Sequence, residues 1–132
     1  MIEEDYVSFE VAKLLKEKGF DEGCSFVVNT ISKGVMPVSW PTTNSDIEDE
    51  KASLVALPTL QMAMKWLREM YGLIIVVHPS YPIDGIKYES LIYRLTELKD
   101  ASVDEYNYDD KEYDNYEQAC EAAIKYSLEN LV

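Results

Sequence analysis

Apolar residues at helical spacing predict a helix near the start of the chain, over residues 7–20. Ser8 precedes the first apolar stripe, and a serine side chain caps helix N-termini well. Gly19 suits the left-handed residue that follows a helix, and Phe20 can then fold back on Leu15, as in a Schellman ending. The pattern therefore predicts both ends of this helix.

A second helix is predicted over residues 57–72, where apolar residues recur every three or four positions. Pro58 fits its first turn, where the missing N–H has no helical partner in any case. Three further large residues, Met62, Trp66 and Met70, widen the apolar face on one side. The face itself consists of Leu60, Ala63, Met64, Leu67 and Tyr71.

A third helix is predicted over residues 114–132. Two residue pairs at its start have the spacing of a capping box, in which two side chains satisfy the free N–H groups of the first turn. These pairs are Asp114 with Glu117 and Asn115 with Gln118, and the sequence leaves both open. The residues expected on the buried stripe are Ala119, Cys120, Ala123, Ile124, Ser127, Leu128 and Leu131.

Short apolar runs predict the strands. Residues 26–28 and 35–40 have the pattern of a hairpin, and Pro37, which lacks an N–H, places the return strand at a sheet edge or at a bulge. The β-branched run 73–79 is typical of a central strand covered on its faces. Residues 91–95 alternate as a further strand, and the alternation slips just before them, as at a bulge.

Two polar stretches lie between these elements. Residues 41–53 are rich in Pro, Thr, Asn, Ser and acidic residues, which is typical of a loop. Residues 104–117, DEYNYDDKEYDNYE, combine acids and tyrosines with one lysine and no aliphatic residue. The end of this stretch belongs to the start of the third helix, and residues 104–110 are expected to form a solvated, acidic edge whose tyrosines are half-packed.

The order of elements is helix, hairpin, helix, strand, strand, helix, and neighbouring strands in such an order pair most simply as antiparallel. We therefore expect an α+β fold, with one antiparallel sheet of about four strands and three helices packed mainly on one face. A chain of 132 residues favours a single domain over residues 1–132.

The chain carries 25 acidic and 12 basic side chains and a net charge of −13. Such a surface repels phosphate backbones and anionic lipids, so we expect no direct nucleic-acid binding and no membrane binding. The charge leaves basic protein partners possible. A protein partner or self-association is kept open. The absence of a signal-peptide pattern, and the presence of only two cysteines, favour a cytoplasmic location.

The residues with catalytic potential are few: Cys24, His78 and Cys120. A thiol nucleophile needs a nearby base, and nothing in the sequence brings either cysteine to the histidine. One histidine and two distant cysteines are a poor supply of zinc ligands, and the glycines fit no phosphate-binding loop. We therefore predict no catalytic residues and no cofactor, with these three residues kept as weak site candidates.

The acidic stretch also invites a comparison with calcium-binding loops. An EF-hand loop needs a glycine at its sixth position. Counting from Asp104, that position is Asp109, and counting from Glu105 it is Asp110. Because the glycine is missing in both frames, we predict no metal site.

Large apolar side chains suggest an interaction surface instead. Trp40, Met62, Trp66 and Met70 are candidate interface residues, because methionines and aromatic residues are enriched at protein interfaces. The alternative is that this stripe belongs to the core, which is the more frequent place for such residues.

Two segments carry a resemblance to known proteins: PTLQMAMKWLREMYGLIIVV (residues 58–77) and YEQACEAAIKYSLENL (residues 116–131). In these motifs, and in an acidic middle loop like NSDIEDE, the chain resembles a group of small uncharacterised proteins from gut bacteria and their prophages. The resemblance implies a compact domain of helices and strands in a mobile-element or accessory context. It implies no catalytic residues.

The leading hypothesis is a small, acidic, cytoplasmic accessory or protein-interaction domain that is not an enzyme. One alternative is a nucleic-acid mimic, whose acids would imitate phosphates and occupy the basic cleft of a DNA-binding protein. The other is a small enzyme or ligand-binding protein that uses Cys24, His78 or Cys120 with nearby acids.

Overall fold

The structure is a computed structural model, and it describes residues 2–47, 53–83, 85–95, 103–106 and 111–132. The chain divides into two compact units, Met1–Thr59 and Leu60–Val132. The expectation of a single domain stays a prediction.

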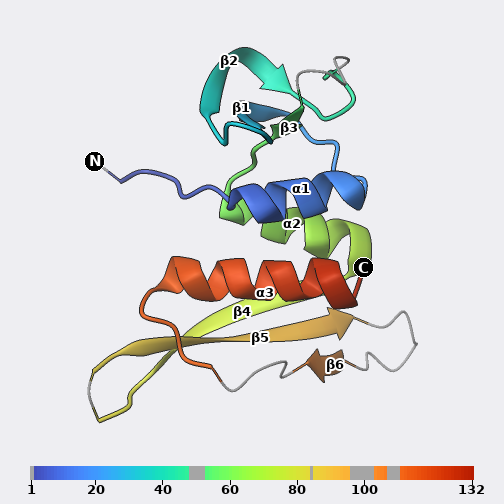
Figure 1. The fold of residues 1–132 in the computed structure, drawn as a ribbon. Helices are drawn as coiled ribbons and strands as arrows, with labels where there is room; N and C mark the ends of the chain where they lie inside the picture. Colours follow the sequence, from blue (N-terminus) through green and yellow to red (C-terminus); the bar gives the residue numbers. More distant parts are fainter. Residues whose placement is uncertain (1, 48–52, 84, 96–102, 107–110) are drawn as a thin grey trace. The chain divides into compact units, whose positions relative to one another are not determined.

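The described residues form helices and strands in both units, so the α+β class is confirmed (Figure 1). The first unit contains α1 (Phe9–Glu17), β1 (Cys24–Asn29), β2 (Val35–Thr42) and β3 (Leu54–Ala56). The second unit contains α2 (Leu60–Tyr71), β4 (Leu73–Ser80), β5 (Lys87–Leu95), β6 (Val103–Tyr106) and α3 (Tyr116–Asn130).

The strands form two antiparallel sheets, with the orders β2-β1-β3 and β4-β5-β6. The prediction of one sheet of about four strands is therefore wrong. The short strand β3 occupies the second edge of β1, and β6 pairs with β5, so each hairpin completes a sheet of its own. The helices divide accordingly: α1 packs on β3, whereas α2 and α3 pack on β4 and α3 also packs on β5.

The first helix has both of the predicted ends. The Ser8 hydroxyl accepts a hydrogen bond from the backbone N–H of Val11 at 3.2 Å. Gly19 has a φ of +93°, and the N–H of Phe20 donates to the carbonyl of Leu15 at 2.9 Å, as a Schellman ending requires. Phe20 and Leu15 are both buried, so this ending fixes the first unit's core as well as its helix.

The sheet of the first unit places β2 at an edge. Among the described residues, β2 pairs with β1 alone, which confirms the edge position inferred from Pro37. The pairing is irregular, because Cys24 lies opposite Thr42 whereas Phe26 lies opposite Pro37. The extra residues of β2 make a bulge, the second device by which a strand tolerates proline.

The second helix begins later than the sequence predicts. Pro58 lies before α2, because its carbonyl accepts from the N–H of Val7 at 3.1 Å and the next residue, Thr59, forms a β-bridge with Tyr6. These contacts hold the backbone extended up to the first helical residue, Leu60. The residues buried on α2 are Leu60, Ala63, Met64, Trp66 and Leu67.

The strand β4 lies at the edge of its sheet in the described part of the chain, and β5 is the central strand. The prediction of a covered central strand at 73–79 is wrong, because only Leu73 of β4 is fully buried. The predicted bulge before residue 91 is also absent. The register runs without interruption from Leu73 opposite Arg94 to Ser80 opposite Lys87.

The third helix settles the choice between the two capping boxes. The Asn115 side chain accepts from the N–H of Gln118 at 2.8 Å, so Asn115 is the N-cap. The Asp114 carboxylate instead forms an ion pair with Lys87 of β5. The predicted buried stripe is confirmed except at Leu131, which is half-buried.

The acidic, tyrosine-bearing stretch is partly a strand. Residues 103–106 form β6, with Glu105 opposite Tyr93, and β6 lies at the edge of its sheet in the described part of the chain. The solvated, acidic edge expected at 104–110 stays a prediction. Residues 107–110 lie outside the described residues. After them, Tyr113 bridges Tyr88 through two backbone hydrogen bonds of 2.9 and 2.8 Å.

Candidate interaction surface

The three weak site candidates are distributed over both units. Cys24 is in β1 of the first unit and is buried. Cys120 is in α3 of the second unit and is fully buried. His78 is also in the second unit, on β4, and is partly exposed.

Burial makes both cysteines poor nucleophiles. It raises the pKa of the Cys24 thiol to about 11, and the charge of Glu22 adds to this rise. Burial also raises the pKa of the Cys120 thiol to about 11, although a hydrogen bond with Tyr116 works in the opposite direction. Since the thiolate is the reactive form, both side chains are suited to packing rather than to attack.

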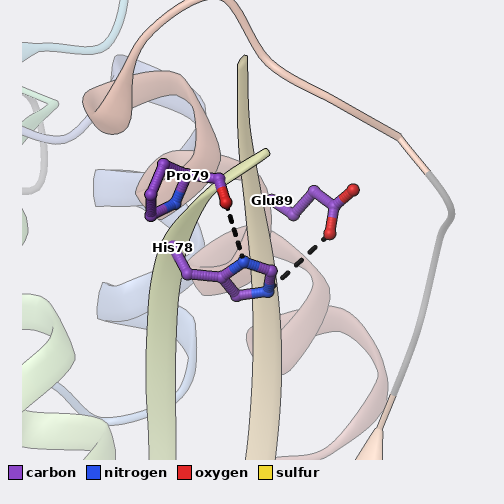
Figure 2. Close-up of polar contacts among 3 residues, drawn as sticks. All are labelled: His78, Pro79 and Glu89. Atoms are coloured by element: carbon purple, nitrogen blue, oxygen red, sulfur yellow. Dashed lines mark hydrogen bonds and ion pairs between the residues drawn. The ribbon is translucent and has the colours of Figure 1, made fainter. Parts of the chain in front are cut away.

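The histidine is occupied by contacts on its own hairpin (Figure 2). Its Nε2 lies 3.7 Å from Oε2 of Glu89, which faces it across the β4–β5 pair, and its Nδ1 lies 3.4 Å from the carbonyl oxygen of Pro79. The thiol of Cys120 interacts with Tyr116 instead. The contacts of the described residues therefore do not join His78 to Cys120.

The part of the chain that the structure describes also bears on metal and membrane sites. No group of three or more His, Cys, Asp or Glu residues lies close enough there to hold a metal ion. Among the same residues, no helix combines the length and the apolar composition needed to cross a bilayer.

The four candidate interface residues separate into core and surface. Trp66 is only 5% exposed, and its ring packs edge-to-face on Tyr71 with the centroids 5.3 Å apart. Met62 is half-buried. Met70 is 61% exposed near the end of α2, and Trp40 is 74% exposed on β2. Of these two exposed side chains, that of Trp40 is the less usual, because the indole ring is large and apolar.

Trp40 belongs to a larger apolar surface, which we call the β2 edge. It consists of the strand Val35–Thr42, whose residues are exposed or half-buried throughout. Val35 and Met36 are exposed together with Trp40, and the strand contains no charged residue. The sequence singled out Trp40 but not Val35 or Met36. The edge position inferred from Pro37 could have indicated that these two side chains are exposed as well.

An acidic turn lies at the C-terminal end of the β2 edge. The Asp21 carboxylate accepts hydrogen bonds from the N–H of Ser45 at 2.7 Å and from its hydroxyl at 2.5 Å, and these bonds lower the pKa of Asp21. The Asp46 carboxylate accepts from the N–H of Thr43 at 3.0 Å. The Asp21 carboxylate therefore stays charged, and both carboxylates are held in place by hydrogen bonds beside the end of the strand.

The same turn is anchored to the core of the first unit. The Asn44 side chain donates to the carbonyl of Phe20 at 2.7 Å and accepts from the N–H of Ala56 on β3 at 2.9 Å. Residues 43–47, which the sequence assigns to a loop, are thus tied through Asn44 to the residue that ends the turn after α1, Phe20, and to β3. The remaining loop residues 48–52 lie outside the described residues.

A second exposed apolar group lies between β4 and β5. Tyr81, Ile83 and Ile86 are all strongly exposed in the connection of this hairpin. These three side chains lie on a connection between strands, whereas those of the β2 edge lie along a strand.

Comparison with known proteins gives no further identification. The chain matches no protein-family model, no curated protein and no solved structure. Its candidate function therefore rests on its own residues.

Proposed function

We propose that this chain is a small, non-enzymatic protein-interaction domain that binds a protein partner through the β2 edge. The observation that carries the proposal is an eight-residue edge strand without a charged residue, on which Trp40 is 74% exposed. The accessory and mobile-element context is part of the same proposal, and the motifs of residues 58–77 and 116–131 support it. A cytoplasmic location is also proposed, and two free cysteines support it.

The physical reason lies in how proteins treat sheet edges. An edge strand presents unpaired backbone N–H and C=O groups, and natural proteins protect such edges with charges, prolines or covering segments. The β2 edge has Pro37 and Pro41 but no charge, and large apolar side chains lie on it. Exposed tryptophan and methionine side chains at an open edge are typical of a surface that a partner covers.

The thiols and the histidine support the non-enzymatic part of the proposal. A Cys–His enzyme needs an accessible thiol of lowered pKa beside its base. In this chain both thiols are buried with a pKa of about 11, and the contacts described for His78 are with Glu89 and Pro79.

The test is a capture experiment with three purified baits: the wild-type chain, Trp40→Lys and Met70→Lys. Met70→Lys is the matched control, because it also places a lysine at an exposed apolar position but lies on α2. We expect the wild-type bait and the Met70→Lys bait to retain at least one protein in common. In its purified form this protein should bind Trp40→Lys about tenfold more weakly or worse, as for a tryptophan at the centre of an interface.

Circular dichroism of the three baits establishes that they share one fold. The proposal is abandoned if every partner that binds directly is indifferent to Trp40→Lys, or if no partner binds at all.

A further inference from the structure

The charges around the β2 edge point to the chemistry of its partner. We infer that the β2 edge binds an extended segment of a partner protein that carries apolar and basic residues, and that the segment adds to the sheet as a fourth strand beside β2. This inference rests on the proposed function and specifies the partner's binding segment.

The backbone of β2 supplies the main contact. On one side β2 is paired with β1, through Val28 opposite Val35 and Val27 opposite Met36. Alternate residues of an antiparallel strand direct their N–H and C=O groups to opposite sides, so in the regular part of β2 about half of these groups face away from β1. Pro37 and Pro41 have no N–H to offer to an added strand. An added strand forms its ladder with those groups, and its side chains contact Val35, Met36 and Trp40 on the two faces of the sheet.

The acidic turn supplies the charge preference. Asp21 and Asp46 are fixed by hydrogen bonds at the C-terminal end of β2. Glu22 is exposed and lies next to Gly23, which approaches Pro41 so closely that a Cβ on this glycine would lie 2.9 Å from the Cβ of Pro41. Two fixed carboxylates, together with the exposed residue Glu22 next to Gly23, therefore lie near the last residues of the edge. A segment with lysine or arginine is attracted there, and an acidic segment is repelled.

The overall charge favours a basic partner over a second copy of this chain. Residues 1–59 contain eleven acidic and five basic residues, and the whole chain has a net charge of −13. Two copies paired through their β2 edges bring like charges together, whereas a basic segment is attracted to the same surface.

The experiment uses the full chain and three fluorescein-labelled peptides of eight residues. One alternates valine and lysine, the second alternates valine and glutamate, and the third is the valine–lysine peptide with every second backbone nitrogen methylated. Fluorescence anisotropy measures binding at low and high salt. We expect saturable binding of the valine–lysine peptide, which weakens as salt rises because the charges involved are exposed.

The acidic and the N-methylated peptides should bind about tenfold more weakly or worse, because one is repelled and the other cannot complete a ladder. Glu22→Lys should weaken binding of the basic peptide by roughly threefold, as for an exposed charge pair. Glu3→Lys makes the same charge change in the N-terminal segment and should leave binding unchanged. Trp40→Lys should weaken it strongly.

Three outcomes overturn the inference. Equal binding of the acidic and basic peptides would contradict the charge preference. Failure of the basic peptide to bind would contradict the inference that a basic segment is the ligand. If sedimentation shows a dimer of the wild-type chain, and Trp40→Lys dissociates it, then a second copy of the chain occupies the β2 edge. In each case the proposed function is judged separately, by whether a purified natural partner depends on Trp40.

Discussion

At the scale of single residues, two neighbouring polar side chains at the start of α3 have different tasks. Asn115 has extended backbone angles, φ −142° and ψ 165°, and its side chain accepts from the N–H of Gln118. Asp114 is exposed, and its ion pair with Lys87 lowers the pKa of its carboxyl group. The sequence could not choose between them, because both have a suitable partner three residues later and only the backbone geometry distinguishes the cap.

This assignment predicts the result of two alanine substitutions. Asn115→Ala should lower the free energy of unfolding by about 1 kcal/mol, because the first turn of α3 loses its capping acceptor. Asp114→Ala removes only an exposed charge pair and should have the smaller effect. Urea denaturation of both variants measures the difference. A larger loss for Asp114→Ala than for Asn115→Ala would contradict the assignment of the cap.

At the scale of elements, the sequence predicted helices better than strands, and the reason is physical. Each end of α1 depends on residues that are close in the sequence, Ser8 with Val11 at the start and Phe20 with Leu15 at the end. The local sequence therefore contains what determines both ends. The neighbours of a strand come from distant parts of the chain. The apolar run of β4 therefore suggested a central strand, although the central position belongs to β5.

The missed strands show the same limit. The three residues of β3 are too few for a periodic pattern, and β6 consists of residues 103–106, which are mostly polar. Each is a strand because a neighbour offers it an edge: β1 to Leu54–Ala56, and β5 to Val103–Tyr106. For a similar reason the sequence could not separate the exposed Trp40 from the buried Trp66, since both are tryptophans and differ only in what covers them.

The ending of α1 predicts a contrast between two glycines of the first unit. Gly19→Ala should lower the free energy of unfolding by about 1 kcal/mol, because a residue with a Cβ is strained at a φ of +93°. The space around Gly19 is open, so the cost is conformational rather than steric. Gly34→Ala is the control: Gly34 is not in the left-handed region, and the added Cβ would meet only the Ser32 hydroxyl oxygen at 3.4 Å.

Thermal and urea denaturation of both glycine variants measure this contrast. Gly34→Ala should change the free energy of unfolding by no more than about 0.5 kcal/mol, as is usual at an exposed site. Equal losses in the two variants would show that the left-handed residue does not determine how α1 ends.

At the scale of the whole molecule, one buried thiol in each unit links stability to alkaline pH. Cys24 lies in the unit of residues 1–59 and Cys120 in the unit of residues 60–132, and both have a pKa raised from 9.0 to about 11. Below pH 9 the folded and unfolded states both keep the proton. Between pH 9 and 11 the unfolded state loses it and the folded state does not, so stability falls as the pH rises.

The expected loss between pH 9 and 11 is on the order of 2 kcal/mol for each thiol, because a pKa difference of about two units has that free-energy equivalent. Tyr116 should add to it in the same direction. Its hydrogen bond with Gln61 lowers the pKa of its hydroxyl, but burial and Cys120 outweigh this and raise it.

Urea denaturation under reducing conditions from pH 7.5 to 10.5 measures the slope of stability against pH. Cys24→Ala and Cys120→Ala should each lower stability at pH 7.5, because a packed sulfur is lost, yet each should make the alkaline slope shallower than that of the wild-type chain. The slope is the informative quantity, since lysines and the other tyrosines titrate in the same range in all three proteins. A slope left unchanged by both substitutions would mean that the thiols titrate alike in the folded and unfolded chain, and it would also remove the argument that burial keeps them unreactive.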